Sequence, residues 1–367
     1  MKYFSTFSGI GGFELGIIQA YEDNLKFEHI SKKSEQKKRS QRRVGAIDER
    51  QKSVRITDRS APLCIGFSEI DKYAIQIYEK HFPRHTNFGD ITKINADTLP
   101  DFNLLIGGFP CQSFSIAGKR KGFEDTRGTM FFELARILRA KQPELFVFEN
   151  VKGLLSHDNG QTFRTIIATL DELGYDLQWQ VLNSKNFGVP QNRERVFIVG
   201  NLRGTPRPKV FPITASNPKG LEELTNKAQQ GYRVYDENGI NPTLASQAGG
   251  VGAKTGLIKV KNASDNRCEL LQRNEQSKKI IARTVRGGGR SSPHGSKQNW
   301  DSYELNGKIR RLTPIECERL MSWPDDWTKY GIDEKGNKIE ISDSQRYKMC
   351  GNGVVSNCVK ELYKTLF

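Results

Sequence analysis

Histidine is scarce in this sequence, and its apolar residues never gather into a long run. There are 5 histidines in 367 residues, and none of the 6 cysteines is spaced as Cys-x-x-Cys, so the usual zinc-site patterns are missing. No stretch approaches the ~18 apolar residues that a membrane-spanning helix needs. The first residues also lack the basic and apolar segments of a secretory signal peptide. We therefore expect no metal, no membrane contact, a cytoplasmic location and free thiols.

Positive charge, in contrast, is in excess. The chain has 57 Lys and Arg against 42 Asp and Glu, a formal net charge of +15. Clustered cations bind polyanions because they release counterions from phosphates, so this excess is typical of a nucleic-acid partner as well as of a basic solvated surface. Residues 31–60 alone hold 11 Lys and Arg against 4 Asp and Glu. We predict a flexible insertion there, either a solvated loop or a contact to a nucleic-acid backbone.

Short apolar runs alternate with amphipathic runs along the first half of the chain. The expected strands are 3–7, 64–68, 104–106, 146–148 and 196–199, and the expected helices are 12–20, 74–81, 130–140 and 161–173. Strands that alternate with helices in this way predict a doubly wound α/β sheet.

The alternation stops at residue 204. Residues 204–308 are rich in Gly, Asn, Ser and Arg, which predicts loops and short strands, and residues 309–327 then favour helix. We therefore expect a sheet domain over residues 1–203 and a smaller domain over 204–340. The C-terminal segment 341–367 is expected to return to the sheet domain.

A glycine turn follows the first expected strand, in Phe7-Ser-Gly-Ile-Gly-Gly12. Such a turn lets backbone amides approach a ligand at a helix N-terminus. Glu14 stands where a dinucleotide fingerprint would have its third glycine, so a nucleoside fits better than a pyrophosphate. At later strand ends, Glu69 can accept from ribose hydroxyls and Asp90 from an adenine amine, although either could be an ordinary loop carboxylate.

Cys111 follows a buried strand and the residues Gly-Gly-Phe-Pro. Open α/β sheets bind ligands at this edge, whereas a structural cysteine more often lies inside the strand. The small and polar residues from Gln112 to Gly128 have the composition of a mobile lid.

Three more charged residues lie at strand ends. Glu149 comes at the end of a buried strand, where a carboxylate is costly unless it is paired or protonated, and a protonated one can donate to a ring nitrogen. Arg193 and Arg195 alternate before the strand at 196, so both guanidinium groups can face one phosphate or carbonyl oxygen.

Together these blocks resemble the DNA cytosine-5 methyltransferase family of the bacterial and phage restriction-modification type. The matching blocks, in the family's order, are FSGIGGFELG, SEID, GDIT, GGFPCQSFS, FENV, NFGVPQNRERVFIVG, RRLTPIECERLMSWPDDW and YKMCGNGVVSNCV. Residues 31–60 and 204–308 fall outside them, the latter where the family carries its variable target-recognition region. One block departs from the family pattern, because Gly353 stands where a Ser or Ala is expected.

The resemblance implies a Rossmann-like domain that binds S-adenosyl-L-methionine and a second domain that recognises the target. It implies a monomer that acts on double-stranded DNA, with a cognate restriction endonuclease as a further partner. The catalytic residues it implies are Cys111, Glu149, Arg193 and Arg195. The cofactor residues it implies are Phe7, Gly9, Gly11, Glu69, Ile70, Asp90, Pro110 and Asn352. The candidate DNA contacts are Gln112, Ser113, Gln191, Arg233, Gln247, Arg286, Arg290 and Lys297.

The family mechanism requires a cytosine flipped out of the duplex, because C6 is inaccessible in a stacked base. The Cys111 thiolate would add to C6, Glu149 would hydrogen-bond or protonate N3, and C5 would then take the methyl group.

Three other functions stay open on the sequence alone. A tRNA cytosine-5 methyltransferase shares the catalytic blocks but has a smaller recognition region, so the long segment 204–308 favours DNA. A DNA-binding module that resembles a methyltransferase but is not an enzyme is a second alternative. The presence of Cys111, Glu149 and Arg195 argues against it. A nicotinamide oxidoreductase is disfavoured by the missing glycine fingerprint and by the Pro-Cys segment.

Overall fold

The protein forms two compact units along its chain. In this computed structural model the described residues are 1–41, 61–110, 130–206, 208–213, 234–236, 241–242, 257–260, 308–310 and 312–366. Unit 1 comprises Met1–Leu182, Glu194–Thr214 and Val354–Phe367, and unit 2 comprises Asn183–Arg193 and Ala215–Gly353. We expected the second domain to span residues 204–340. Unit 2 instead includes the earlier segment Asn183–Arg193 and ends at Gly353. The functions expected of the two domains stay predictions.

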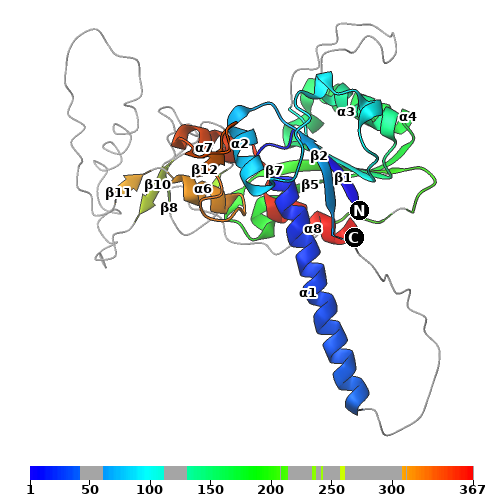
Figure 1. The fold of residues 1–367 in the computed structure, drawn as a ribbon, viewed down its shortest axis with the longest axis horizontal. Coiled ribbons are helices and arrows are strands. Elements are labelled where there is room, and N and C mark those ends of the chain that lie inside the picture. The colour runs from blue at the N-terminus through cyan, green and yellow to red at the C-terminus, as the bar shows by residue number, and fades with distance from the viewer. Residues whose placement is uncertain are drawn as a thin grey trace. The chain divides into compact units, whose positions relative to one another are not determined.

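A six-stranded sheet is the centre of unit 1, with strand order β2-β1-β3-β4-β7-β5 (Figure 1). The strands are β1 (Lys2–Thr6), β2 (Leu63–Ser68), β3 (Leu104–Gly108), β4 (Leu145–Val151), β5 (Tyr175–Asn183) and β7 (Glu194–Leu202). The first four run parallel, and β7 runs antiparallel to β4. This mostly parallel sheet confirms the α/β fold expected from the sequence.

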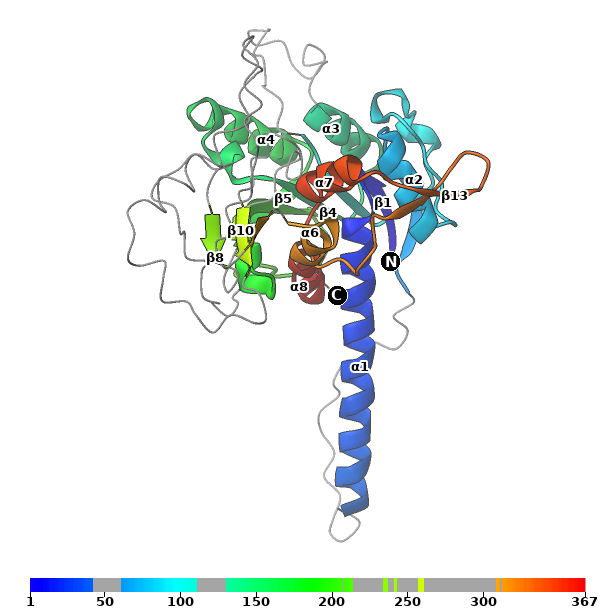
Figure 2. The ribbon, with the colours of Figure 1, turned by 90° about the vertical axis from the view of Figure 1, so that its left-hand side faces the viewer.

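Helices cover both faces of the sheet. They are α1 (Gly12–Gln41), α2 (Lys72–His81), α3 (Met130–Lys141), α4 (Gln161–Glu172) and α8 (Ser356–Leu366), with 3-10 turns η1 (Ile91–Lys93), η2 (Ala96–Thr98), η4 (Lys152–Leu155) and η5 (His157–Gly160). Figures 1 and 2 show α3 and α4 on one face and α1 and α8 on the other. The Ser356 hydroxyl donates to the Gly12 carbonyl at 2.9 Å, which ties α8 to the start of α1.

One expectation about this unit is wrong. Residues 31–41 were expected to belong to a flexible insertion, but α1 continues to Gln41 (Figure 2). Residues 21–41 contain no Gly or Pro and are rich in Lys, Glu and Gln, which are good helix formers. An extension without an apolar stripe escapes a search for amphipathic periodicity. The rest of the insertion, 42–60, lies outside the described residues.

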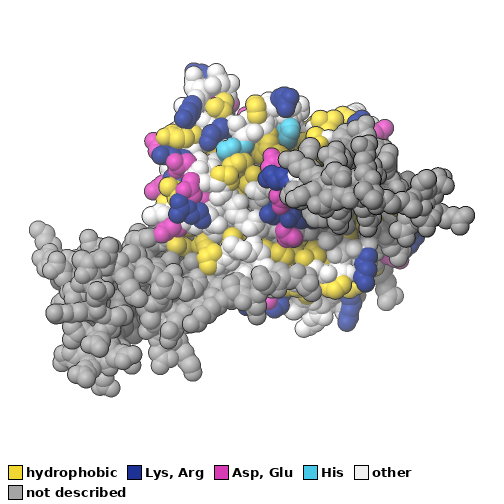
Figure 3. Space-filling view, turned by 90° about the horizontal axis from the view of Figure 1, so that it is seen from below, with side chains coloured by type: hydrophobic (Ala, Val, Ile, Leu, Met, Phe, Trp, Pro, Cys, Tyr) yellow, Lys and Arg dark blue, Asp and Glu magenta, His cyan; other side chains and the backbone are white. Residues whose placement is uncertain are grey.

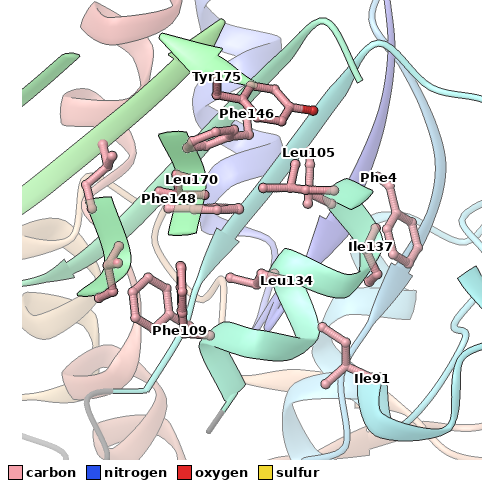
Figure 4. Close-up of a cluster of buried hydrophobic side chains, with 14 of the residues drawn as sticks. Phe4, Ile91, Leu105, Phe109, Leu134, Ile137, Phe146, Phe148, Leu170 and Tyr175 are labelled. Carbon is pink, nitrogen blue, oxygen red and sulfur yellow. The ribbon is translucent and has the colours of Figure 1, made fainter. Parts of the chain in front are cut away.

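Aromatic side chains build the core at the carboxyl ends of β3 and β4 (Figure 4). The Phe109 ring is 3% exposed and lies 5.7 Å from the Phe131 ring and 6.3 Å from the Phe148 ring, between centroids. Full burial of a phenylalanine side chain stabilises a fold by roughly 1.5–3 kcal/mol. The residue two positions before Cys111 is therefore an anchor in the core.

Unit 2 is described in part, and its elements are short. They are η6 (Ser184–Phe187), β6 (Gln191–Asn192), β8 (Val234–Asp236), β9 (Asn241–Pro242), β10 (Leu257–Val260), β11 (Lys308–Arg310), α6 (Pro314–Leu320), β12 (Tyr330–Ile332), β13 (Lys338–Glu340) and α7 (Asp343–Asn352). β8, β10 and β11 form one sheet, and β6 pairs with β9. Inside the unit, the buried Glu318 carboxylate accepts from the Thr328 amide at 2.8 Å and from Arg346 at 3.1 Å.

Candidate active site

The carboxyl ends of the parallel strands of unit 1 lie level with one another. Thr6, the last residue of β1, is paired with Ser68 at the end of β2 and with Gly107 of β3. The next residue of β3, Gly108, is paired with Glu149 near the end of β4. The loops that follow these strands therefore begin at the same edge of the sheet, where open α/β sheets bind their ligands.

The turn after β1 has a backbone that requires glycine. Gly9 and Gly11 have φ of +54° and +85°, in the left-handed region, and Phe7 shares it at +50°. A Cβ at Gly11 would lie 2.3 Å from the Phe82 ring, whereas no described atom lies within 4 Å of a Cβ placed at Gly9. Gly11 is thus fixed by packing, and Gly9 borders open space, as a ligand-facing turn needs.

Glu69 directs its carboxylate back at this turn. One oxygen accepts from the Gly9 amide at 2.8 Å, and the other accepts from the amides of Ile70 and Asp71, both at 2.8 Å. The Asn87 side chain accepts from the Gly89 amide at 2.9 Å and donates to the Glu69 carbonyl at 3.2 Å, which connects the loops after β2 and before η1. Sequence reasoning missed Asn87, which stands two residues before the Gly-Asp-Ile-Thr block.

Asp90 and Ile70 have the properties that a nucleoside site requires. Asp90 caps η1, and hydrogen bonds from the Thr92 hydroxyl and amide lower the pKa of its carboxyl group, so it is ionised at neutral pH. Its side chain is 35% exposed and can therefore meet a ligand. Ile70 is 71% exposed, although it is apolar. Two carboxylates that can accept from hydroxyl or amine groups, an exposed apolar side chain and open space at Gly9 fit the adenosine part of S-adenosyl-L-methionine.

Glu149 and Arg195 form an ion pair at the ends of β4 and β7. Arg195 Nε lies 3.0 Å from Glu149 Oε1, and the two side chains are 16% and 13% exposed. Antiparallel pairing sets Val151 opposite Arg195, which brings the guanidinium group to the carboxylate two residues along β4. The carboxylate is therefore paired, which is one of the two states expected of it, and its role at a ring nitrogen stays a prediction.

Asn150 fixes the backbone that leads to Cys111. It is 1% exposed, and its side-chain amide donates to the Phe109 carbonyl at 2.9 Å, while its oxygen accepts from the Val151 amide at 2.8 Å. Pro110 is the last described residue before the gap and is exposed. Cys111, Gln112, Ser113 and the predicted lid lie outside the described residues. Sequence reasoning also missed Asn150, although it stands inside the Glu-Asn-Val block.

The Gln-x-Arg-x-Arg block is divided between the two units. Gln191 donates to the Leu320 carbonyl at 2.7 Å within unit 2. One terminal nitrogen of Arg193, which is 2% exposed, donates to the carbonyls of Gly351 and Gly353 at 2.9 and 2.7 Å, also within unit 2.

These contacts differ from the roles expected of the block, a DNA contact for Gln191 and catalysis for Arg193, which stay predictions. Asn352, between the two carbonyls that Arg193 holds, is exposed.

The described cysteines are buried thiols outside any disulfide in the described part of the chain: Cys64, Cys317, Cys350 and Cys358. Burial raises the pKa of both Cys64 and Cys317 to about 12, so neither is a thiolate at neutral pH. The thiol that sequence analysis selected is not among them.

The candidate base-reading residues of the second domain cannot be placed, because Arg233, Gln247, Arg286, Arg290 and Lys297 lie outside the described residues. On the face in Figure 3, basic and acidic side chains of the described residues are interspersed. Across the described part of the chain, no helix is long and apolar enough to span a membrane, and no group of three acidic, histidine or cysteine side chains could hold a metal.

Residues 56–367 match the family model described as C-5 cytosine-specific DNA methylase. The chain is 34% identical over 334 residues to the Type II methyltransferase M.HhaI of Haemophilus parahaemolyticus, over 81% of this chain and 85% of the relative. It is 34% identical over 365 residues to the Type II methyltransferase M.NlaX of Neisseria lactamica, over 96% and 92%. The orphan methyltransferase M.SPRI of Bacillus phage SPR is 32% identical over 407 residues, 82% of this chain and 91% of the relative.

Two solved structures share the fold. A DNMT2 mutant of Spodoptera frugiperda superposes with a TM-score of 0.63 at 19% identity, over 100% of this chain and 99% of that one. The methyltransferase EhMeth of Entamoeba histolytica gives 0.60 at 16% identity, over 100% and 98%. The family model covers most of the sequence, and three relatives at 32–34% identity cover most of it as well, so the chain belongs to the C-5 cytosine-specific DNA methylase family.

Proposed function

We propose that this DNA cytosine-5 methyltransferase uses Cys111 to activate a flipped-out cytosine within a specific duplex sequence. The observation that carries the proposal is the Glu149–Arg195 ion pair, because it stands beside the end of the strand that leads to Cys111. A buried carboxylate and guanidinium at this edge can hold a polar base by its ring nitrogen and its carbonyl oxygen.

S-Adenosyl-L-methionine, when bound, supplies an electrophilic methyl group. In the proposal Glu69 accepts from the ribose hydroxyls, Asp90 accepts from the adenine amine and Ile70 lies against the adenine ring. Phe7, Gly9, Gly11, Pro110 and Asn352 complete the set by resemblance.

The proposed chemistry is carried by Cys111 and Glu149. Addition of the Cys111 thiolate to C6 forms a sulfur–carbon bond, breaks the C5–C6 double bond and makes C5 a nucleophile. Glu149 donates a proton to N3 as sulfur adds, which neutralises the negative charge that develops there, and takes the proton back when the thiolate leaves; Arg195 holds both Glu149 and the base. After C5 has accepted the methyl group, it loses its proton to a base to which we assign no residue. The double bond re-forms and the thiolate leaves.

The thiol must be activated, because a free cysteine has a pKa of about 8.5 and is only a few per cent thiolate at neutral pH. Arg195 is a cation at this strand edge, and we infer that it favours the thiolate.

The recognition sequence and the partner system belong to the proposal too. The second domain would read bases, and a cognate endonuclease would make this a restriction-modification enzyme. Relatives named Type II and relatives named orphan both match the chain, so the pairing needs its own test.

Methyl transfer from labelled S-adenosyl-L-methionine to duplex DNA and to tRNA tests the proposal. We expect label in DNA, bisulfite-resistant cytosines at one short sequence, and loss of activity in Cys111→Ser. Cys64→Ala, which changes a buried thiol of the core, should retain activity. Label in tRNA alone would overturn the DNA assignment, and an active Cys111→Ser enzyme would remove Cys111 as the nucleophile.

A further inference from the structure

Asn150 lies beyond the point where β3 and β4 stop pairing. Gly108 opposite Glu149 is the last pair of the ladder, and Phe109 is the first residue after the end of β3. The Asn150 side chain donates to the Phe109 carbonyl at 2.9 Å and so extends the connection between the two strands by one residue. This contact is fully buried, since Asn150 is 1% and Phe109 is 3% exposed.

The carbonyl that Asn150 holds belongs to a stiff segment. It is part of the Phe109–Pro110 peptide, whose proline fixes φ, and the Phe109 ring is packed against Phe131 and Phe148. A hydrogen bond on the backbone and a ring in the core together restrict both the position and the rotation of this peptide. Cys111 is bonded directly to Pro110.

The neighbouring residue on β4 is Glu149, which is paired with Arg195. In the proposed function, Glu149 contacts N3 of the cytosine and Cys111 attacks C6. Asn150, the next residue of the same strand, holds the backbone that carries Cys111. We infer that Asn150 is a positioning residue that sets the separation between the Cys111 sulfur and the Glu149 carboxyl group. The inference rests on the proposed function, which makes Cys111 and Glu149 partners on one base.

Asn150→Asp is the sharpest test, because it keeps the shape and replaces the donor with an acceptor that the Phe109 carbonyl repels. Misplacement of a reacting group by about 1 Å can cost 100-fold in rate. We expect kcat to fall about 10- to 100-fold, with KM for DNA and for S-adenosyl-L-methionine nearly unchanged. Asn150→Ser, which adds no charge and whose hydroxyl is too short to reach the carbonyl, should lower kcat in the same way.

Asn201 offers a matched control in the same sheet. It is also 1% exposed, lies on β7 opposite Leu145 at the far end of β4, and donates to the Pro206 carbonyl at 3.2 Å. Asn201→Asp should lower the thermal unfolding midpoint about as much as Asn150→Asp but retain kcat. Equal losses of kcat in the two variants would show a general effect of stability and would overturn the inference.

The rate at which iodoacetamide alkylates Cys111, followed by peptide mass spectrometry, is a second readout that needs neither DNA nor cofactor. The buried Cys64 and Cys317 serve as unreactive internal references. We expect this rate to change about threefold or more in Asn150→Asp and to stay constant in Asn201→Asp. An unchanged rate, or an unchanged kcat, would overturn the inference. A wild-type enzyme that transfers no methyl group would instead overturn the proposed function, and the alkylation rates would still report on Asn150.

Discussion

Glu14 is a charged residue in unit 1 that the proposed chemistry does not use. It lies in the first turn of α1, is fully buried, and accepts from the Tyr78 hydroxyl at 2.9 Å. Burial raises its pKa from 4.5 to about 6, against the opposing effect of its hydrogen bonds. The fold therefore favours the protonated form of this carboxyl group.

Glu14→Gln should stabilise the protein at neutral pH. A carboxyl group with a raised pKa in the folded state contributes stability below its unfolded pKa, and this contribution is lost as the pH rises through the folded value. From the shift of 4.5 to about 6, the variant should gain up to about 2 kcal/mol above pH 6. The gain should shrink towards zero near pH 4.5.

Urea unfolding of wild type and Glu14→Gln at pH 5 and pH 7.5 measures this difference. Glu133→Gln, on the part-buried side of α3, is a suitable reference because Glu133 is paired with Arg136 at 2.8 Å and should lose rather than gain stability. A gain that does not depend on pH would contradict the burial of a charged Glu14.

Residue 353, at the end of α7, is tightly enclosed by its neighbours. A Cβ at Gly353 would lie 2.6 Å from two atoms of the Trp323 ring and 3.1 Å from the Met349 carbonyl. The φ of Gly353 is −75°, so its backbone suits any residue, and the restriction is one of space. The glycine therefore makes room for a large ring in the core of unit 2.

Gly353→Ala should destabilise unit 2 by roughly 1–3 kcal/mol, the usual cost of overpacking. Trp323→Phe alone should also destabilise unit 2, because the Trp323 side chain is only 3% exposed and a smaller ring leaves a cavity in its place. The double variant should be more stable than the sum of the two effects predicts, as chemical denaturation of all four proteins would reveal. Strict additivity would mean that the two residues do not compete for the same space.

Whole elements were predicted where the pattern of apolar residues was strong. The parallel strands and the residues at their carboxyl ends followed from buried runs and glycine turns, and Glu69, Asp90 and Glu149 lie at the predicted edge. β5 was missed although Tyr175, Leu177, Trp179 and Val181 alternate with polar residues, which is the pattern of a half-exposed strand.

Contacts between distant parts of the chain were beyond prediction. Nothing in the sequence says that the Arg193 guanidinium group is taken up by carbonyls more than 150 residues away in the chain. The same holds for Asn150, because a side-chain hydrogen bond to a backbone carbonyl leaves no periodic signal.

At the scale of the molecule, the excess of positive over negative charge comes from two segments. Residues 31–60 carry a net +7, and residues 204–308 hold 17 Lys and Arg against 9 Asp and Glu, a net +8. These two segments account for the whole net charge of +15, so the remaining residues are neutral in sum. Both segments lie outside the blocks that carry the chemistry, which favours a role in binding the phosphate backbone.

Substitution of Gln for the basic residues of the extended part of α1 should weaken the salt dependence of DNA binding. The residues are Lys32, Lys33, Lys37, Lys38 and Arg39, and Gln retains helix propensity. Each neutralised phosphate contributes about 0.9 to the slope of log K against log salt, so the slope should become shallower by that amount for every phosphate that the variant no longer neutralises. Titrations of duplex DNA at several salt concentrations measure it, and an unchanged slope would leave this segment a solvated surface.

The tie between α8 and the start of α1 also bears on the order in which the protein is made. Gly16 of α1 has no room for a side chain, because a Cβ there would lie 2.6 Å from Val359 of α8. Residues 356–366 follow unit 2 in the chain and leave the ribosome after it. A nascent chain therefore exposes the apolar face of α1 until synthesis has passed through the entire second unit. Unit 1 completes its packing only after the residues of unit 2 have been made.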